Sequence, residues 1–334
     1  MKRLSLLIAA LAVPLLASAE APNSLLNVSY DVSRGFYQSY NPVFVQHYEA
    51  QTGQKVTINQ SHGGSGKQAR AVVEGLEADV VTMNSGLDID IIATQAKGKV
   101  AADWRSAFPQ GAAPSWSTTL FIVRKGNPKG INDWPDLTRK GVSVVIPNPK
   151  TSGNGRYSYL AAWLYGLSQP NGSEATAKAF VGKLFNNVPI LDGGGRGATT
   201  SFAQRAVGDV LLTFESEVNL ILQEFGEDKF EVVVPSVSIR AANPVVVVED
   251  VTAKRGTAEL AKTYLGYLYS DAGQDLYVKS HLRPSVPSAW ERHKGKFADL
   301  KTLDAEKALG ATWLEIFEAH FKDGGHFDQL AINQ

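Results

Sequence analysis

The sequence predicts an α/β fold of two lobes, each with a largely parallel sheet. Short apolar runs of strand length alternate with segments of helical periodicity along most of the 334 residues, which is the pattern of α/β domains. One local arrangement, a strand followed by a loop of small residues and a helix, also occurs over 25–48, 55–76, 142–166 and 188–207. Two of these units precede a Pro-, Ser-, Ala- and Trp-rich stretch at 103–118 and two follow it, so we expect one sheet in each lobe.

The first lobe is expected to begin with an apolar strand over 25–30, which leads into a helix with aromatic residues at helical spacing. The next unit has a short alternating strand, a loop over 61–67, and a helix with apolar residues at i, i+3, i+4 and i+7. A strand over 79–83 and a helix over 86–98 complete this part of the lobe.

The second lobe is expected to span residues 119–239. Strands over 230–234 and 244–248 return the chain to the first lobe, and a helix over 258–269 and further helices follow. Lobe 1 is therefore predicted to be discontinuous, over 20–118 and 240–334. Because loops that follow strand C-termini lie along one sheet edge, we expect a ligand cleft between the lobes. From residue 119 onward, strands are predicted over 120–128, 141–146, 188–191, 209–214, 230–234 and 244–248.

The N-terminus has the pattern of a cleavable secretory signal. Lys2 and Arg3 precede an apolar run over 4–16, which ends in small residues up to Ala19. The run is shorter than the roughly 20 residues that span a bilayer, which disfavours a membrane anchor. We expect residues 1–19 to be removed by cleavage after Ala19 and the mature chain to be exported without inserting in a membrane.

Composition disfavours several classes of function. The formal net charge is zero and there is no cysteine, so disulfides, thiolate catalysis and Cys-ligated metals are excluded and no nucleic-acid partner is expected. No two of the six histidines stand at i, i+3 or i+4, the spacing of a helical metal site. We therefore expect no metal, no cofactor and no catalytic residue.

The loop over 61–67 predicts an anion site. It precedes a helix, whose first N–H groups lack partners and lie at the positive end of the helix dipole. It only partly matches a nucleotide-binding loop, because Ser61 replaces the first Gly and Gln68 replaces the hydroxyl residue that would hold magnesium. Lys67 also stands where a nucleophile elbow has its second Gly. A purely structural turn remains an alternative for any one such loop.

The loops over 61–67 and 151–155 contain no carboxylate. Donors without an acceptor suit a dianion that carries no proton, such as sulfate, thiosulfate, molybdate or tungstate, better than hydrogen phosphate. Asp31 is expected to contribute its backbone N–H while its side chain turns to a basic neighbour such as Arg34. Arg156 and Arg196 have two possible roles, pairing with the anion or forming interlobe contacts, and we favour the second.

Four segments, 25–31, 60–69, 147–154 and 194–200, resemble the periplasmic sulfate- and thiosulfate-binding proteins of ABC importers. The resemblance extends from about residue 25 to the C-terminus. It implies the fold of a type II periplasmic binding protein, with two α/β lobes joined by two crossover strands. It also implies a periplasmic location and delivery of the anion to the membrane permease of an ABC importer. We expect a monomer.

The resemblance further implies an oxyanion held by neutral donors, without a counter-charge. Sulfate-binding members have a Trp, whose indole N–H donates to the anion, at the position of Phe214. The run 214–219 is more similar to the thiosulfate-binding branch and the loop 63–66 to the sulfate-binding branch, so the preference between the two anions stays open. The alternatives are a receptor for molybdate or phosphate and an exported ester hydrolase. The implied donors are the backbone N–H groups of Asp31, Ser65, Gly153, Asn154 and Gly195 and the hydroxyl of Ser152.

Overall fold

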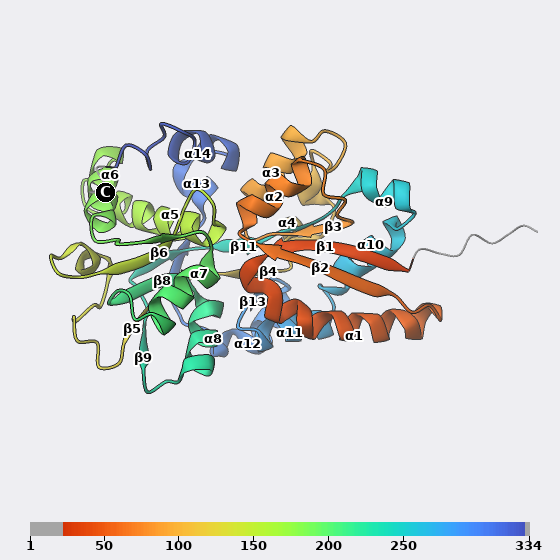
Figure 1. Cartoon of the computed structure of the whole chain (residues 1–334), viewed down its shortest axis with the longest axis horizontal. Helices are drawn as coiled ribbons and strands as arrows, with labels where there is room; N and C mark the ends of the chain where they lie inside the picture. Colours follow the sequence, from red (N-terminus) through yellow and green to blue (C-terminus); the bar gives the residue numbers. More distant parts are fainter. Residues whose placement is uncertain (1–22, 331–334) are drawn as a thin grey trace, which may run out of the picture.

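A computed structural model describes residues 23–330 and consists of two lobes side by side (Figure 1). The predicted signal peptide over 1–19, with its cleavage after Ala19, lies outside the described residues. Between residues 23 and 330, no helix has the length and apolar character needed to cross a membrane.

Lobe 1 is built on a four-stranded sheet with the order β12-β3-β1-β2. The central strand β1 pairs in parallel with β2 and β3, while β12 pairs with β3 in the antiparallel sense. Leu25 and Val28 of β1 are fully buried, because helices cover both faces of the sheet. The strands are β1 (Ser24–Tyr30), β2 (Thr57–Gly63), β3 (Val80–Thr82) and β12 (Val245–Val247).

The helices of lobe 1 carry apolar stripes that face this sheet. In the first helix, Phe36, Tyr40 and Phe44 recur every fourth residue and share a core with Tyr264, whose ring centroid is 5.0 Å from that of Phe44. The helices are α1 (Arg34–Thr52), α2 (Ser65–Val73), α3 (Gly86–Gln95), α4 (Pro109–Ala112), α9 (Glu249–Arg255), α10 (Ala258–Tyr267), α11 (Asp271–Lys279) and α12 (Pro287–His293).

Lobe 2 is built on a five-stranded sheet with the order β7-β6-β8-β5-β9. The strands that lead into helices, β6, β7 and β8, pair in parallel, whereas β5 is antiparallel to both β8 and β9. The elements are β5 (Thr119–Arg124), β6 (Val144–Pro147), β7 (Leu191–Asp192), β8 (Val210–Phe214), β9 (Phe230–Val233), α5 (Gly153–Leu167), α6 (Glu174–Phe185), α7 (Gly195–Thr199), which continues as a π-helix over Thr200–Gln204, and α8 (Glu215–Phe225).

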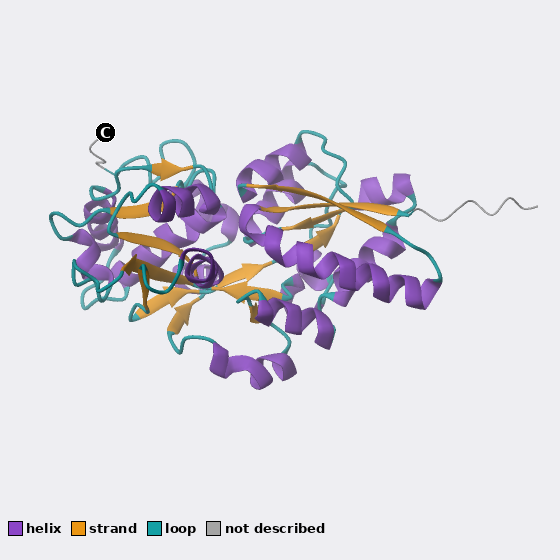
Figure 2. Cartoon of the chain, turned by 60° about the horizontal axis from the view of Figure 1, so that its bottom comes forward, coloured by secondary structure: helices purple, strands orange, loops and turns teal. Residues whose placement is uncertain are grey.

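Short strands join the lobes (Figure 2). One sheet has the order β11-β4-β13 and another pairs β10 with β14. The chain crosses between the lobes from β4 to β5, from β10 to β11, and a third time between α12 and β14. The strands are β4 (Ser115–Ser117), β10 (Val237–Ile239), β11 (Ala241–Asn243), β13 (Arg283–Pro284) and β14 (Lys301–Leu303).

The third crossing places the C-terminal helices α13 (Ala305–Leu309) and α14 (Trp313–His320) on lobe 2. Trp313, Ile316 and Leu330 share one buried cluster with Tyr159 and other residues of α5 and α6. The sequence-based boundary assigned all of 240–334 to lobe 1, and α14 contacts α3 of that lobe as well as the core of lobe 2. The apolar faces of these helices indicate burial, but they do not specify which lobe is covered.

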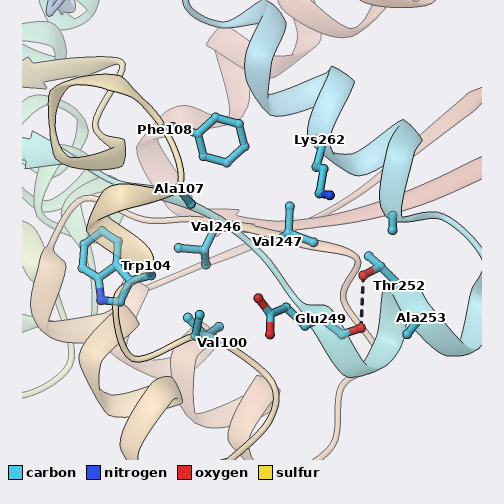
Figure 3. Close-up of a pocket in the computed structure, with 12 residues that line it drawn as sticks. Val100, Trp104, Ala107, Phe108, Val246, Val247, Glu249, Thr252, Ala253 and Lys262 are labelled. Carbon is cyan, nitrogen blue, oxygen red and sulfur yellow. Dashed lines mark hydrogen bonds between the residues drawn. The ribbon is translucent and has the colours of Figure 1, made fainter.

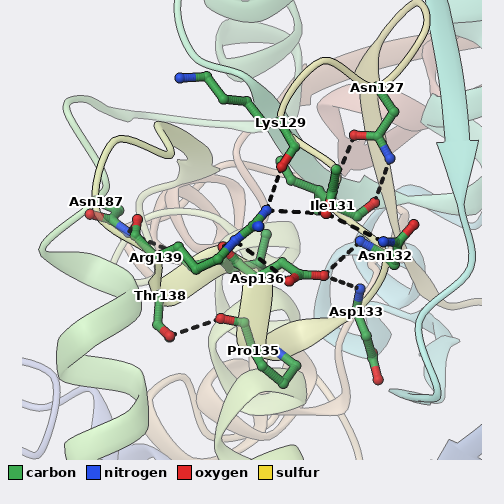
Figure 4. A network of polar contacts seen from close by, with 12 residues as sticks. Asn127, Lys129, Ile131, Asn132, Asp133, Pro135, Asp136, Thr138, Arg139 and Asn187 are labelled. Carbon is green, nitrogen blue, oxygen red and sulfur yellow. Dashed lines mark hydrogen bonds and ion pairs between the residues drawn. The ribbon is translucent and has the colours of Figure 1, made fainter.

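A polar network fixes the connection between β5 and β6 (Figure 4). The Asn127 side chain accepts from the Ile131 N–H at 2.9 Å and donates to the Ile131 carbonyl at 2.8 Å. The Arg139 guanidinium donates to the carbonyls of Lys129 and Gly130 and lies 3.5 Å from the Asp136 carboxylate. These contacts satisfy backbone groups of the loop, and we assign them a structural role.

His320 is expected to make the fold sensitive to acid. Its ring lies against Trp163 and its Nδ1 is 3.0 Å from the Tyr159 hydroxyl. Burial, reinforced by His326, lowers the pKa of His320 to about 4. Since the unfolded chain binds this proton at higher pH, stability should be lost as pH falls from about 6.5 towards 4, by up to about 3 kcal/mol. Chemical unfolding of wild type and His320→Gln across this range measures the effect. Parallel pH profiles would contradict it.

Candidate functional site

Six helix starts lie at the ends of strands in the two lobes. In lobe 1 they follow β1, β2 and β3, and in lobe 2 they follow β6, β7 and β8, so each lies at the carboxyl end of a strand. This is the edge at which open α/β sheets bind ligands. The residues at these starts are Asp31 in the 3-10 turn Asp31–Ser33, Gly64 and Ser65, Ser85, Ser152 and Gly153, Gly194 and Gly195, and Phe214.

Hydrogen bonds connect the loops of the two lobes. The Gly153 N–H donates to Ser65 Oγ at 3.0 Å, and the Arg196 N–H donates to Asp31 Oδ2 at 3.3 Å. The structure thus brings loops from both lobes together. We call this region the interlobe site and define it by Asp31, Ser65, Ser152, Gly153, Asn154 and Gly195.

Two glycines of the interlobe site permit the close approach of the lobes. A Cβ at Gly64 would lie 2.9 Å from the carbonyl oxygen of Thr151 and 3.0 Å from that of Gly193. A Cβ at Gly153 would lie 2.0 Å from Asn84 Oδ1 and 2.8 Å from Ser65 Oγ. Each contact is to the opposite lobe, so larger residues at these positions would separate the lobes.

Arg156 forms an interlobe ion pair, as favoured from the sequence. Its Nη2 lies 2.5 and 2.7 Å from the two carboxylate oxygens of Asp88 and 3.2 Å from Ser65 Oγ. Both charged side chains are almost completely buried. The charge of Arg156 is therefore already compensated by Asp88.

The Asp31 side chain does not turn to Arg34, and that expectation was wrong. Its carboxylate accepts from the Arg196 N–H of the opposite lobe and from the Val32 N–H at 3.0 Å. Burial raises its pKa, and the hydrogen bond from the Arg196 backbone opposes this rise. The N–H of Arg196 lies in the first turn of α7, where it has no partner within the helix, and it is therefore free to donate to Asp31. The two residues are distant in the sequence.

The Arg196 guanidinium stays within lobe 2. It lies 3.7 Å from Glu217 and 3.8 Å from Glu224, both on α8. Burial raises the pKa of Glu217 to about 7, and the nearby Arg196 charge counteracts this effect. Arg196 therefore contributes its backbone N–H to the lobe contact, while its side chain partly neutralises a buried acid.

Ser152, Asn154 and Phe214 are nearly inaccessible to solvent, with exposed fractions of 1–2%. Ser152 caps α5, because its Oγ accepts from the Gly155 N–H at 3.4 Å. The Asn154 amide donates to Thr213 Oγ1 at 2.8 Å, which connects α5 to the end of β8. The Phe214 ring lies 5.9 Å from that of Tyr157 and offers no hydrogen-bond donor.

An apolar pocket of about 410 Å³ lies elsewhere, on lobe 1 between α9, α10 and the segment before α4 (Figure 3). Its walls are mainly Val, Ala, Trp and Phe side chains, which do not suit a small, strongly hydrated oxyanion. Within the described residues, no group of three or more His, Asp or Glu side chains is arranged to hold a metal ion.

The two α/β lobes are joined by short crossover strands and contact each other at the starts of helices. This arrangement is typical of bacterial solute-binding proteins. Residues 32–283 match the family model for the bacterial extracellular solute-binding protein. The chain belongs to this family.

Relatives match over nearly the whole chain. The thiosulfate-binding protein of Pseudomonas aeruginosa is 52% identical over 333 residues, which is 99% of both chains. The sulfate-binding protein of Escherichia coli (strain K12) is 47% identical over 307 residues, or 92% of both chains.

Solved structures share the fold. The sulfate-binding protein SubI from Mycobacterium tuberculosis H37Rv superimposes with a TM-score of 0.80 at 29% identity, over 90% of this chain and 100% of that one. The periplasmic binding protein AfuA from Actinobacillus pleuropneumoniae, with a TM-score of 0.68 at 18% identity, covers 90% of this chain and 99% of its own. The predicted periplasmic-binding-protein fold is confirmed.

Asp88 and Asn84 lie beside the interlobe site, against Arg156 and Gly153, and were not predicted to do so. Asp88 is separated from Arg156 by 68 positions, and spacing along the chain carries no information about such a pair. The available signal was local: both residues lie where β3 leads into α3, the same kind of junction as the other loops.

Proposed function

We propose that this chain is a periplasmic receptor that binds sulfate or thiosulfate between its lobes and delivers it to an ABC importer. The observation that carries this proposal is the meeting of helix starts from both lobes at the interlobe site, with the Arg156 charge neutralised by Asp88. A dianion there would be held by backbone N–H groups and a hydroxyl. Relatives named as binding these two anions, at 47–52% identity, support the choice of ligand.

We assign the donors to the backbone N–H groups of Asp31, Ser65, Asn154 and Gly195 and to the Ser152 hydroxyl. The Gly153 N–H, the remaining predicted donor, is paired with Ser65 Oγ. For Gly153 to donate to the anion, the Ser65 side chain must turn away. Donors that an anion must share with Ser65 contribute less to its affinity than free ones.

Calorimetric titration of dialysed protein with sulfate, thiosulfate, phosphate and molybdate tests the function. We expect sulfate and thiosulfate to bind and to compete for one site, and phosphate to bind more weakly at neutral pH because its proton lacks an acceptor. Tight binding of molybdate or phosphate, without binding of either sulfur oxyanion, would overturn the proposed ligand.

Replacing Phe214 with Trp is expected to raise the preference for sulfate over thiosulfate. The indole N–H would supply a donor to the face of the anion at which Phe offers none. A hydrogen bond to a charged group contributes about 1.5–3 kcal/mol, and thiosulfate would gain part of it, so we expect a change of roughly threefold to tenfold in relative affinity. Competition binding gives the ratio, with Phe230→Trp on β9 as the control. An unchanged ratio in Phe214→Trp would refute the role of the missing donor.

We further propose that the chain is a monomer without catalytic activity. Its partner is the permease of an ABC importer, and closure over the anion is the signal that the permease recognises. Incubation of the protein with chromogenic sulfate and phosphate esters tests the alternative of an ester hydrolase. Turnover above the rate of buffer alone would contradict the receptor function.

A further inference from the structure

A second buried ion pair between the lobes lies outside the interlobe site. The Arg283 guanidinium of β13 contacts the Glu215 carboxylate of α8 in bidentate fashion, at 2.6 and 2.9 Å. Arg283 and Glu215 are 3% and 2% exposed. Bidentate arginine–carboxylate pairs fix orientation as well as distance, because both groups are planar.

This pair lies where the segments that join the lobes converge. Arg283 is opposite Trp116 of β4 in the small sheet. The Glu215 N–H donates to the Thr118 carbonyl at 2.8 Å, at the crossover from β4 to β5. Arg283 also donates to the Ala298 carbonyl at 2.6 Å, and Glu215 accepts from the Ala298 N–H at 3.3 Å, on the third crossing. The residues of this ion pair therefore link the crossover from β4 to β5 with the third crossing.

Aromatic side chains surround the cation and exclude water from it. The guanidinium carbon lies 4.8 Å from the ring centre of Trp116, 5.3 Å from that of Phe297 and 5.7 Å from that of Trp290. A cation in such a place is stable only with its partner, so the pair strongly favours one relative position of β13 and α8.

Glu215 directly follows Phe214, the last residue of β8. The position of its carboxylate therefore fixes the end of β8 and the start of α8. The end of β8 is joined in turn to α5 through the bond from Asn154 to Thr213. The pair thus connects the crossover segments to the half of the interlobe site that lobe 2 contributes.

We propose that Arg283 is a positioning residue for oxyanion binding, which sets the angle between the lobes through its contact with Glu215 and so aligns the two halves of the interlobe site. This inference rests on the proposed receptor function. Arg283 acts through the closed arrangement of the lobes, so its loss should accelerate opening and release of the anion.

Release of radiolabelled sulfate or thiosulfate into excess unlabelled anion tests the proposal. Arg283→Lys keeps the charge but loses the bidentate contact. We expect its dissociation rate constant to rise about tenfold while the association rate constant changes less than about threefold. The matched control is Arg292→Lys on the neighbouring α12, which alters a solvent-exposed pair with Asp271 of α11 and should release the anion at the wild-type rate.

The double variant Arg283→Met/Glu215→Gln guards against misfolding of the single variant. Removing both charges leaves neither buried without a partner, so this protein should fold. We expect the same faster release as in Arg283→Lys. Release at the wild-type rate by either folded variant would overturn the proposal and leave the receptor function intact. Absence of binding by the wild type would instead overturn the receptor function, and this inference with it.

Discussion

Replacing Gly153 with Ala is expected to weaken anion binding by about fivefold to 150-fold, the equivalent of the 1–3 kcal/mol typical of overpacking. The added Cβ would meet Asn84 Oδ1 and Ser65 Oγ, both on lobe 1, when the lobes are closed. Asn84 is 2% exposed and has little space in which to move. Gly153 is the first residue of α5, and the atoms that its Cβ would meet belong to the opposite lobe. The variant should therefore fold, and the substitution should disturb mainly the closed arrangement of the two lobes.

Calorimetry with sulfate and thiosulfate measures this effect, and thermal unfolding without anion measures the fold. Gly266→Ala in α10 is the matched control, since a Cβ there has no heavy atom within 4 Å. Both variants should unfold near the wild-type temperature, and only Gly153→Ala should bind weakly. Wild-type affinity in Gly153→Ala would show that the close approach at this glycine is not needed for binding.

Replacing Ser152 with Ala should weaken sulfate binding by about tenfold to 150-fold. A hydrogen bond to a charged group typically contributes about 1.5–3 kcal/mol, and the hydroxyl is assigned to the dianion. The substitution also removes the cap of α5, which lowers the free energy of unfolding by about 0.5–2 kcal/mol. The two effects need to be measured separately.

Ser173→Ala provides the control for the capping effect. Ser173 caps α6 in the same way as Ser152 caps α5, with its Oγ accepting from Thr176 N–H at 3.2 Å, but it is exposed and distant in sequence from the site loops. We expect Ser173→Ala to lose stability and keep its affinity, whereas Ser152→Ala loses both. Equal affinities for the two variants would remove Ser152 from the donor set.

The sequence could predict the loops of the interlobe site because each has a local pattern. Ser65, Gly153 and Gly195 all stand between an apolar strand and a helix, and that junction determines where their N–H groups point. The proposal that Phe214 lies at the anion was available only through resemblance, since a Phe at a strand end is ordinarily a core residue.

Contacts between distant segments could not be predicted in this way. The pairing of Arg156 with Asp88 and of Asp31 with the Arg196 N–H depends on how the lobes meet. Local reasoning instead gave Asp31 a neighbour, Arg34, which the structure does not support. The partners of the C-terminal helices could not be predicted for a related reason, because an amphipathic face such as that of α14 shows that a surface is buried but not against which partner.

The third crossing has a consequence for the order in which the chain can fold during synthesis. Lobe 1 needs β12 at residues 245–247 before its sheet is complete. Lobe 2 needs Trp313, Phe327 and Leu330 to close its core, although its first strand begins at Thr119. A chain that emerges N-terminus first therefore exposes the apolar face of α5 until almost its last residue has appeared. Until residues 313–330 have been synthesised, this apolar face must be kept from contact with other chains.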